Sequence, residues 1–308
     1  MKILITGGAG YLGSILAEWL LIEHHEVTVL DNLMHGQDGL IPLCSYHDFH
    51  FIHADVRDTT RLKCLAREFD IIIPLAAIVG APACTKDPSS ASEVNLGHVR
   101  EICKFARKDQ IIVFPNTNSG YGNHGGVCTE ETSLSPLSVY GSTKKYAEAS
   151  VLEHGGISLR LATLFGVSYR MRLDLLVNDF TVQALRDRYI VLYEGQFKRN
   201  FLHVRDAASA FCFMLDNYDP HKGQAFNVGL SEANISKHEL ALKVGATLGI
   251  NLDIITSSSD SDPDKRDYMV SNEKIEKAGW KARLSLEDGI KEVAKAYPLL
   301  HKQEYRNA

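Results

Sequence analysis

A run of glycines between the first strand-like segment and the first helix-like segment constrains the fold of this chain most. The segment KILIT reads as a buried strand and YLGSILAEWLLIEH as an amphipathic helix, and ITGGAGYLGS joins them. Its glycines fit G-x-G-x-x-G from Gly8 and G-x-x-G-x-x-G from Gly7. Glycines in this pattern permit a tight turn, close approach of the backbone to a pyrophosphate, and close packing of helix on strand. The turn therefore predicts a dinucleotide site at the start of the helix, formed by Gly7, Gly10, Tyr11 and Leu12.

The N-terminal half of the chain alternates short apolar segments with helical patterns. After KILIT come EVTVLD, HFIHAD, DIIIPLAA, IIVFPN and GISLRLAT, with helical patterns near residues 58–67, 91–107 and 140–153. Strands that alternate with helices indicate βαβ units and a parallel sheet, and strands this apolar are typical of a sheet buried on both faces. We expect an α/β fold with a Rossmann doubly wound parallel sheet.

Beyond about residue 166 the alternation is less regular. Helical patterns lie near residues 174–187, 205–216, 236–248, 271–279 and 286–296. The polar segment TSSSDSDPDKRD interrupts them, and its composition alone is that of a solvated connector.

An acidic residue ends the second strand-like segment, at the distance that a dinucleotide site requires. Asp31 follows Gly13 by 18 residues, so its carboxylate can accept hydrogen bonds from the ribose hydroxyls of NAD. The same carboxylate would repel the 2′-phosphate of NADP, and no arginine follows among residues 32–34. The alternative is that Asp31 only caps a turn. We favour NAD as the cofactor, with Asn32 as a further contact next to Asp31. Asp55, followed by Val56, ends HFIHAD and is suited either to the adenine amine or to a plain turn.

Tyr140 and Lys144 stand four positions apart in SVYGSTKKYAE, where a helical pattern begins. Residues at this spacing share one helix face. A free tyrosine has a pKa of about 10, and a nearby ammonium and an oxidised nicotinamide ring both favour the phenolate. A drop of roughly 3 units would let Tyr140 take a proton from a sugar hydroxyl while hydride leaves the carbon. The spacing alone is common on solvated helices. After a dinucleotide fingerprint, it predicts an active site.

Composition excludes several other classes of protein. The formal net charge of −5 gives no indication of a nucleic-acid partner. The six cysteines form no C-x-x-C pair, which argues against a zinc site and fits free thiols in a reducing compartment. The longest uncharged apolar run, IIIPLAAIVGAPAC, is shorter than the roughly 20 residues of a spanning helix, and MKILIT does not resemble a signal peptide. We expect a cytoplasmic protein with no membrane partner.

Four segments together carry a resemblance to a known family: TGGAGYLGS, LAA at residues 75–77, YGSTK and RNFLHVRDAA. The chain resembles the extended short-chain dehydrogenase/reductase superfamily in its NAD-dependent nucleotide-sugar epimerase/dehydratase branch. IIIPLAAIVGAP, PNTNSGYG, RMRLDLLVNDF and DPDKRDYMVSN are most similar to the GDP-D-glycero-D-manno-heptose 4-dehydrogenases of bacterial capsule polysaccharide biosynthesis. The resemblance implies an NAD-binding Rossmann domain over residues 1–165, with a returning segment at about 200–230. A smaller α/β nucleotide-sugar domain would comprise residues 166–199 and 231–308.

The resemblance also implies further site residues. Leu75, Ala76 and Ala77 would border the cofactor. Thr117 matches the hydroxyl partner of the tyrosine and lysine, although it is also suited to an ordinary turn. Asn95 matches a helix position that orients the active-site lysine through its surroundings.

Two positions depart from the pattern of the dehydratases in this branch. These enzymes carry an Asp-Glu pair after the threonine, where this chain has Asn118 and Ser119. Neither can act as the acid or base of an elimination, so dehydration is disfavoured. Reductases and 3,5-epimerases need a further acid beside the ketone, for which Cys84, Cys128 and His124 are the weak candidates.

The substrate implied by the resemblance is a nucleoside-diphosphate sugar, with a GDP-sugar favoured. Arg199 and Arg266 match the diphosphate ligands, because a guanidinium fork binds two oxygens at once. Asn178 matches a residue that binds the diphosphate or the adjoining sugar, and the polar segment before Arg266 would then be a flap that closes over the nucleotide. Arg170 and Arg172 are suited to phosphate or sugar hydroxyls, or to a solvated junction.

Three functions fit the sequence. The first is oxidation at C4 of the nucleotide sugar to a 4-keto product, which requires a way to reoxidise NADH. The second is 4-epimerisation through a transient 4-keto intermediate. The third is a non-catalytic NAD-binding regulator, whose expected signature is loss of the tyrosine, the lysine or the hydroxyl; this chain has all three. A homodimer through the helices near 91–107 and 140–153 is implied by the resemblance.

Overall fold

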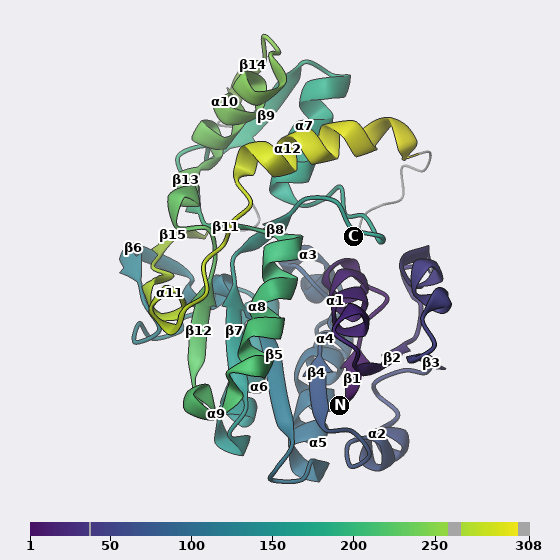
Figure 1. Cartoon of the computed structure of the whole chain (residues 1–308). Helices are drawn as coiled ribbons and strands as arrows, with labels where there is room; N and C mark the ends of the chain where they lie inside the picture. The colour runs from purple at the N-terminus through teal and green to yellow at the C-terminus, as the bar shows by residue number, and fades with distance from the viewer. Residues whose placement is uncertain (37, 258–265, 301–308) are drawn as a thin grey trace.

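The computed structural model describes residues 1–36, 38–257 and 266–300. A seven-stranded sheet forms its centre (Figure 1). The strand order is β12-β7-β5-β4-β1-β2-β3, and each neighbouring pair is parallel. The strands are β1 Lys2–Thr6, β2 Glu26–Asp31, β3 Phe49–His53, β4 Ile71–Pro74, β5 Ile111–Thr117, β7 Ile157–Leu161 and β12 Ala225–Val228. This doubly wound order confirms the predicted fold class.

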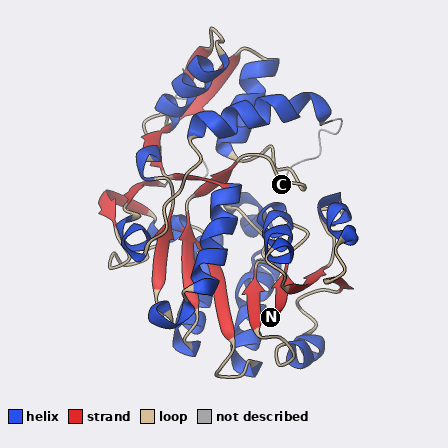
Figure 2. Ribbon diagram, in the orientation of Figure 1, coloured by secondary structure: helices blue, strands red, loops and turns tan. Residues whose placement is uncertain are grey.

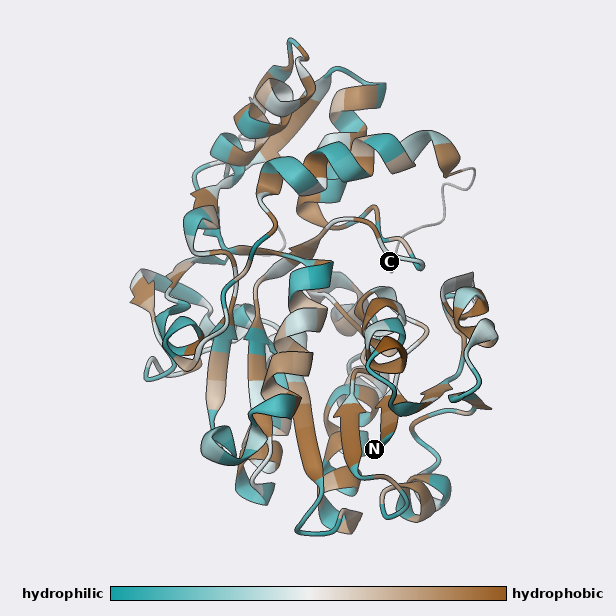
Figure 3. Ribbon diagram, viewed as in Figure 1, coloured by the Kyte–Doolittle hydropathy of each residue, from teal (hydrophilic) through white to brown (hydrophobic). Residues whose placement is uncertain are grey.

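Helices cover both faces of this sheet, as Figure 2 shows. α1 (Tyr11–Ile22) packs beside α8 (Val204–Asp216) on one face, and α2 (Thr59–Leu65), α5 (His98–Phe105) and α6 (Val139–His154) pack together on the other. Side chains of β1 alternate between the two layers: Ile3 and Ile5 belong to the core under α1 and α8, and Leu4 to the core under α5 and α6. The strands at the centre of the sheet, β1, β4 and β5, are accordingly largely apolar (Figure 3).

A second, smaller layer lies beyond the carboxyl ends of the central strands (Figure 1). It contains α7 (Leu176–Arg186), α10 (Lys237–Leu248) and α12 (Leu286–Ala296), which contact one another, and the parallel pair β9 (Tyr189–Tyr193) and β14 (Asp253–Ser257). Ser236 and Ser285 begin α10 and α12 with capping boxes. The predicted helices near 174–187, 205–216, 236–248, 271–279 and 286–296 are therefore all present, the fourth as α11 (Glu273–Ala278).

Short strand pairs connect the two layers, and the sequence did not predict them. β8 (Thr163–Phe165) pairs with β11 (Phe201–His203), β10 (Lys198–Arg199) with β13 (Ile235–Ser236), and β6 (Asn123–Cys128) with β15 (Asp267–Val270). Most have two to four residues, too few for a periodic pattern to show. The remaining helices and turns are η1 Asp38–Ser45, α3 Ala81–Lys86, α4 Pro88–Ser92, η2 Glu93–Gly97, η3 Asn118–Tyr121, α9 Tyr218–His221, η4 Ser231–Ala233 and η5 Tyr297–Leu299.

The helix predicted near 91–107 is divided in the structure. α4 leads into a π-helical turn, η2, and only then into α5. π-helical turns are often found at functional sites, because the extra residue re-aims a side chain. Over the described part of the chain, no helix is both long enough and apolar enough to cross a bilayer.

Candidate active site

One large cavity lies at the carboxyl ends of the central strands, below the smaller layer. Its volume is about 840 Å³, and its walls come from both layers. In doubly wound sheets ligands bind at this edge. Most of the predicted site residues line it: Gly7, Gly10, Tyr11, Leu12, Asp31, Asn32, Asp55, Val56, Leu75, Ala76, Ala77, Thr117, Tyr140, Lys144, Arg170, Arg172, Arg199 and Arg266.

The glycine turn is shaped by close backbone contacts. Gly7 has a φ of +72°, and a Cβ atom there would lie 2.5 Å from the backbone of Ala76. A Cβ atom at Gly13 would lie 2.6 Å from the Cα atom of Gly8. Gly10 precedes α1 without a side-chain cap, and the first turn of α1 carries no acidic residue. The turn therefore brings bare backbone and an uncapped helix start to the cavity, as a pyrophosphate requires.

Asp31 ends β2 with its carboxylate held in place by backbone amides. The amide of Ala9 donates to Oδ2 at 3.0 Å, and that of Leu33 donates to Oδ1 at 2.8 Å. Burial raises the pKa of this carboxyl, and those amides oppose the rise. Asp31 thus closes a local turn, as the alternative interpretation held, and also lines the cavity. Each oxygen has a second lone pair for a ribose hydroxyl.

Asp55 forms an ion pair with Arg57, a residue that the sequence did not indicate. Arg57 donates to both carboxylate oxygens, at 2.9 and 2.8 Å, and Asn32 donates to Oδ2 at 3.1 Å. The hydrogen bonds from Arg57 hold the pKa of Asp55 well below its usual range. Asp55 lines the cavity as a paired anion, together with Arg57.

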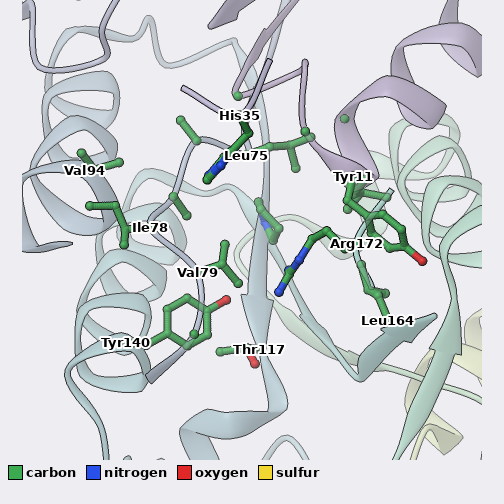
Figure 4. A pocket seen from close by; sticks show the side chains of 18 of the residues that line it. Tyr11, His35, Leu75, Ile78, Val79, Val94, Thr117, Tyr140, Leu164 and Arg172 are labelled. Carbon is green, nitrogen blue, oxygen red and sulfur yellow. The ribbon is translucent and has the colours of Figure 1, made fainter. Parts of the chain in front are cut away.

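Tyr140 and Lys144 lie on successive turns of α6, which begins after the capping residue Ser138. Ser138 also lines the cavity, and its hydroxyl accepts from the amide of Gly141 at 3.1 Å. The side chain of Tyr140 reaches toward the cavity near Thr117 and Val79 (Figure 4).

The pKa values of the pair are set mainly by burial. Burial raises the pKa of Tyr140 to about 12, with Arg172 acting in the opposite direction. This differs from the lowered pKa that the sequence predicted, because the phenol is enclosed by the cavity wall. Burial lowers the pKa of Lys144 to about 7, while Glu148 raises it. The Lys144 ammonium lies 4.0 Å from the centre of the Phe114 ring, a cation–π contact that favours the charged form.

Thr117 lies at the end of β5, with its hydroxyl oriented by Ser119. The two hydroxyl oxygens are 2.8 Å apart, and the amide of Ser119 donates to the Thr117 oxygen at 3.2 Å. Ser119 and Asn118 are buried and lie outside the cavity wall. Ser119 therefore positions Thr117, a role that no local pattern indicated.

Asn95 and Asn178 act behind the cavity wall. Asn95, in the π-helical turn, accepts from the amide of Ile78 at 2.7 Å and donates to its carbonyl at 3.0 Å and to the Thr143 hydroxyl at 3.3 Å. Asn178 is buried, accepts from the amide of Gly166 at 3.0 Å, and donates to the carbonyl of Arg172 at 2.9 Å. Neither lines the cavity, because their amides hold neighbouring loops. This agrees with an indirect role for Asn95, although Asn95 was also considered for the cofactor, and it differs from the substrate contact predicted for Asn178.

The arginines of the cavity occupy different parts of it. Arg170 lies close enough to Asp31 to lower the pKa of its carboxyl, whereas Arg172 acts on Tyr140. Arg199 stacks on Tyr268 at 5.7 Å. Lys237, at the start of α10, also lines the cavity and donates to the carbonyl of Tyr193 at 2.8 Å. Most of the proposed flap, residues 258–265 of the segment TSSSDSDPDKRD, lies outside the described residues.

The three candidates for an additional acid lie outside the cavity wall. Cys84 is buried and donates to the carbonyl of Ile78 at 3.1 Å. Cys128 belongs to a separate apolar cluster, and His124 is exposed on β6. Among the described residues, no group of three or more His, Cys, Asp or Glu could hold a metal ion.

Known proteins resemble the chain over most of its length. The model of the NAD dependent epimerase/dehydratase family matches residues 3–229. The uncharacterized UDP-glucose epimerase YtcB of Bacillus subtilis is 32% identical over 251 residues, which cover 75% of this chain and 78% of that protein. CDP-paratose 2-epimerase of Salmonella typhi is 26% identical, with 95% of this chain and 98% of that protein covered.

Solved structures share the fold. UDP-glucose 4-epimerase of Thermus thermophilus, in complex with NAD, is 25% identical with a TM-score of 0.82, covering 97% of this chain and 99% of that chain. A tyrosine-to-phenylalanine mutant of UDP-glucuronic acid 4-epimerase from Bacillus cereus is 24% identical with a TM-score of 0.88, covering 97% and 100%. That structure holds UDP-4-deoxy-4-fluoro-glucuronic acid and NAD.

Proposed function

Because the chain belongs to the NAD dependent epimerase/dehydratase family, we propose that it oxidises C4 of a nucleotide-activated sugar, specifically a GDP-heptose, to a 4-keto sugar. The chain is an NAD-dependent enzyme of this family. One observation carries the proposal for the reaction: Tyr140, Lys144 and Thr117 line the same cavity as the glycine turn and Asp31. A non-catalytic regulator would not need all three.

The cofactor fits the residues that would hold it. The start of α1 after Gly10 has no side-chain cap, which leaves backbone amides for a pyrophosphate, and the Asp31 carboxylate retains acceptors for a ribose diol. NAD, when bound, supplies the acceptor for the hydride. Two positively charged side chains, Arg57 and Arg170, line the cavity beside the acidic residues Asp55 and Asp31.

Three side chains, those of Thr117, Tyr140 and Lys144, have separate roles in the proposed reaction. The Thr117 hydroxyl holds the C4 oxygen of the sugar, and the Tyr140 phenolate takes the proton from that oxygen. The C4–H bond breaks as the hydride leaves, and the carbonyl of the 4-keto sugar forms. Burial opposes the phenolate, so Tyr140 needs positive charge nearby. Lys144 and the oxidised nicotinamide ring are the sources that we propose, in addition to Arg172.

The substrate side of the cavity is suited to a diphosphate. Arg199, Arg266 and Lys237 line it, and guanidinium groups bind phosphate oxygens in pairs. The choice of GDP rests on the motifs RMRLDLLVNDF and DPDKRDYMVSN, which are similar to those of GDP-heptose enzymes. Asn118 and Ser119 in place of an acidic pair argue against dehydration.

A second candidate function is 4-epimerisation by the same residues. It is favoured by the epimerases among the relatives and structural neighbours, including the putative UDP-glucose 4-epimerase of Methanocaldococcus jannaschii. In that reaction the 4-keto intermediate rotates within the site and is reduced on its other face, so that NAD is regenerated.

Product analysis distinguishes the two functions. The protein is incubated with NAD and GDP-mannoheptose, with UDP- and CDP-sugars in parallel, and the products are examined by mass spectrometry and NMR. NADH together with a 4-keto sugar supports the dehydrogenase, which then requires an acceptor such as an oxo acid to reoxidise NADH. A new diastereomer without net NADH supports the epimerase. An unchanged sugar in every sample would contradict both.

We also propose that the protein is a cytoplasmic homodimer. All six cysteines, which lie within the described residues, are free, as is usual in a reducing compartment. Tyr146 on α6 is 54% exposed and is suited to an interface between helices of two copies. Light scattering of the purified protein tests the dimer.

A further inference from the structure

Two charged residues that line the cavity, Arg172 and Asp174, form a tight pair near the catalytic tyrosine. Arg172 donates from Nε to one Asp174 oxygen at 3.2 Å and from a terminal nitrogen to the other at 2.5 Å. Their side chains are 12% and 23% exposed. In Figure 4 the guanidinium group of Arg172 points toward Tyr140 and Thr117. The pair therefore lies beside the two side chains that would hold the C4 oxygen of the sugar.

The loop that carries the pair is fixed at several points. Asn178 donates to the carbonyl of Arg172 at 2.9 Å. Upstream in the same loop, the Tyr11 hydroxyl donates to the carbonyl of Gly166 at 2.6 Å, and the Ser168 hydroxyl donates to the carbonyl of Tyr11 at 2.6 Å. These bonds tie the loop to α7 and to the start of α1. The position of the Arg172 guanidinium relative to α1 is thus set by the fold.

The chemistry of the pair is unsuited to a second carboxylate. An arginine binds a carboxylate best through a two-point fork, and Asp174 already takes two of the donors of Arg172. A carboxylate on the sugar would also lie close to the negative charge of Asp174, which lines the same cavity. The remaining donors of Arg172 and the remaining lone pairs of Asp174 suit hydroxyl groups, which both donate and accept.

Discrimination between neutral sugars and uronic acids has to come from side chains, since the fold itself admits uronic acids. The Bacillus cereus neighbour holds a nucleotide-activated uronic acid in the same fold. We infer that the Arg172–Asp174 pair selects a neutral sugar by binding its hydroxyl groups and excludes the corresponding uronic acid. The inference rests on the proposed function, and it assigns Asp174 a role in specificity.

The test compares matched pairs of nucleotide sugars that differ only in the carboxylate: GDP-mannose with GDP-mannuronic acid, and UDP-glucose with UDP-glucuronic acid. Binding is measured by calorimetry on the NAD-loaded Tyr140→Phe protein, so that no turnover is required. We expect the neutral member of the pair to bind at least about ten-fold more tightly, the equivalent of one ion-pair or charged hydrogen-bond difference. Asp174→Asn should reduce this preference at least several-fold by strengthening uronic acid binding.

The chain offers a control with the same geometry outside the cavity. Arg186 donates to both oxygens of Asp187, at 2.8 and 2.6 Å, on the surface at the end of α7. Asp187→Asn should leave the preference unchanged. Equal or tighter binding of the uronic acid by the protein carrying Asp174 would overturn the inference alone. GDP-mannoheptose is measured in parallel, and failure of this sugar and of all four others to bind while NAD still binds would overturn the proposed function as well.

Discussion

Glu148 lies one helical turn beyond Lys144 on α6, and both side chains are buried. Its carboxylate accepts from Arg160 at 2.7 Å, from Ser158 at 2.7 Å and from Asn116 at 2.6 Å. The Arg160 hydrogen bonds lower the pKa of Glu148 against the effect of burial, so a negative charge persists beneath Lys144. That charge raises the pKa of Lys144. The buried Glu148 carboxylate thus stabilises the charged form of Lys144.

Glu148→Gln should shift the alkaline limb of the kcat/KM profile to lower pH. Without the carboxylate, the pKa of Lys144 falls further below its present value of about 7, so the ammonium is lost at a lower pH. Activity at pH 8 should decrease several-fold more than activity at pH 6. The variant also breaks a buried ion pair, so its fraction folded is measured by circular dichroism at each pH. A profile that only drops, with no shift, would assign Glu148 a structural role alone.

Tyr140→Phe should abolish hydride transfer while leaving NAD bound. The phenolate is the proposed base, and loss of a general base typically costs about 10²–10⁴-fold in rate. NADH formation is followed by absorbance, and NAD binding by calorimetry. Tyr189→Phe, at an exposed position on β9 outside the cavity, serves as the control. Turnover of the Tyr140 variant at the unaltered rate would contradict the mechanism.

Asp31→Asn should weaken the binding of NAD and permit the binding of NADP. The carboxylate oxygens are the proposed acceptors for the ribose hydroxyls, and a hydrogen bond to a charged group contributes about 1.5–3 kcal/mol. We expect a loss of roughly ten-fold or more in NAD affinity and a smaller loss, or a gain, for NADP. Asp48→Asn, at an exposed position next to His47, is the matched control. Equal losses for the two cofactors would indicate that Asp31 only closes its turn.

Gly7→Ala should destabilise the protein more than the same change at Gly249. Both glycines have positive φ, +72° and +64°, but only at Gly7 would the new Cβ atom collide with backbone, that of Ala76. The shared φ strain costs about 1–2 kcal/mol, and the collision adds about 1–3 kcal/mol at Gly7. The free energy of unfolding from urea titration measures the difference. Equal losses at the two positions would show that the turn relaxes at no cost.

The parts of the site that the sequence predicts are those that a local pattern defines. The glycine turn, the acid after β2 and the Tyr140–Lys144 spacing each occupy one short segment, and each lies at the cavity. Six of the seven central strands were likewise predicted, whereas β12 was not, because its four residues are too few for a pattern to show.

Other features depend on segments that are distant in the sequence. The pairing of Arg172 with Asp174 near Tyr140 requires the loop after β8 to be fixed on α1, and residue types alone do not indicate that contact. Asn178 has the residue type of a phosphate ligand, yet its amide is consumed by Gly166 and Arg172. The burial that raises the pKa of Tyr140 arises from the packing of several elements, and no motif indicates it.

The measurement that tests the central claim most directly uses GDP-mannoheptose carrying deuterium at C4. The protein is mixed with this sugar and NAD in a single turnover, and the nicotinamide and the sugar are analysed by mass spectrometry. The proposed function predicts deuterium on NADH and a 4-keto sugar without it. NADH that carries no deuterium, or a keto group at any other carbon, would contradict oxidation at C4.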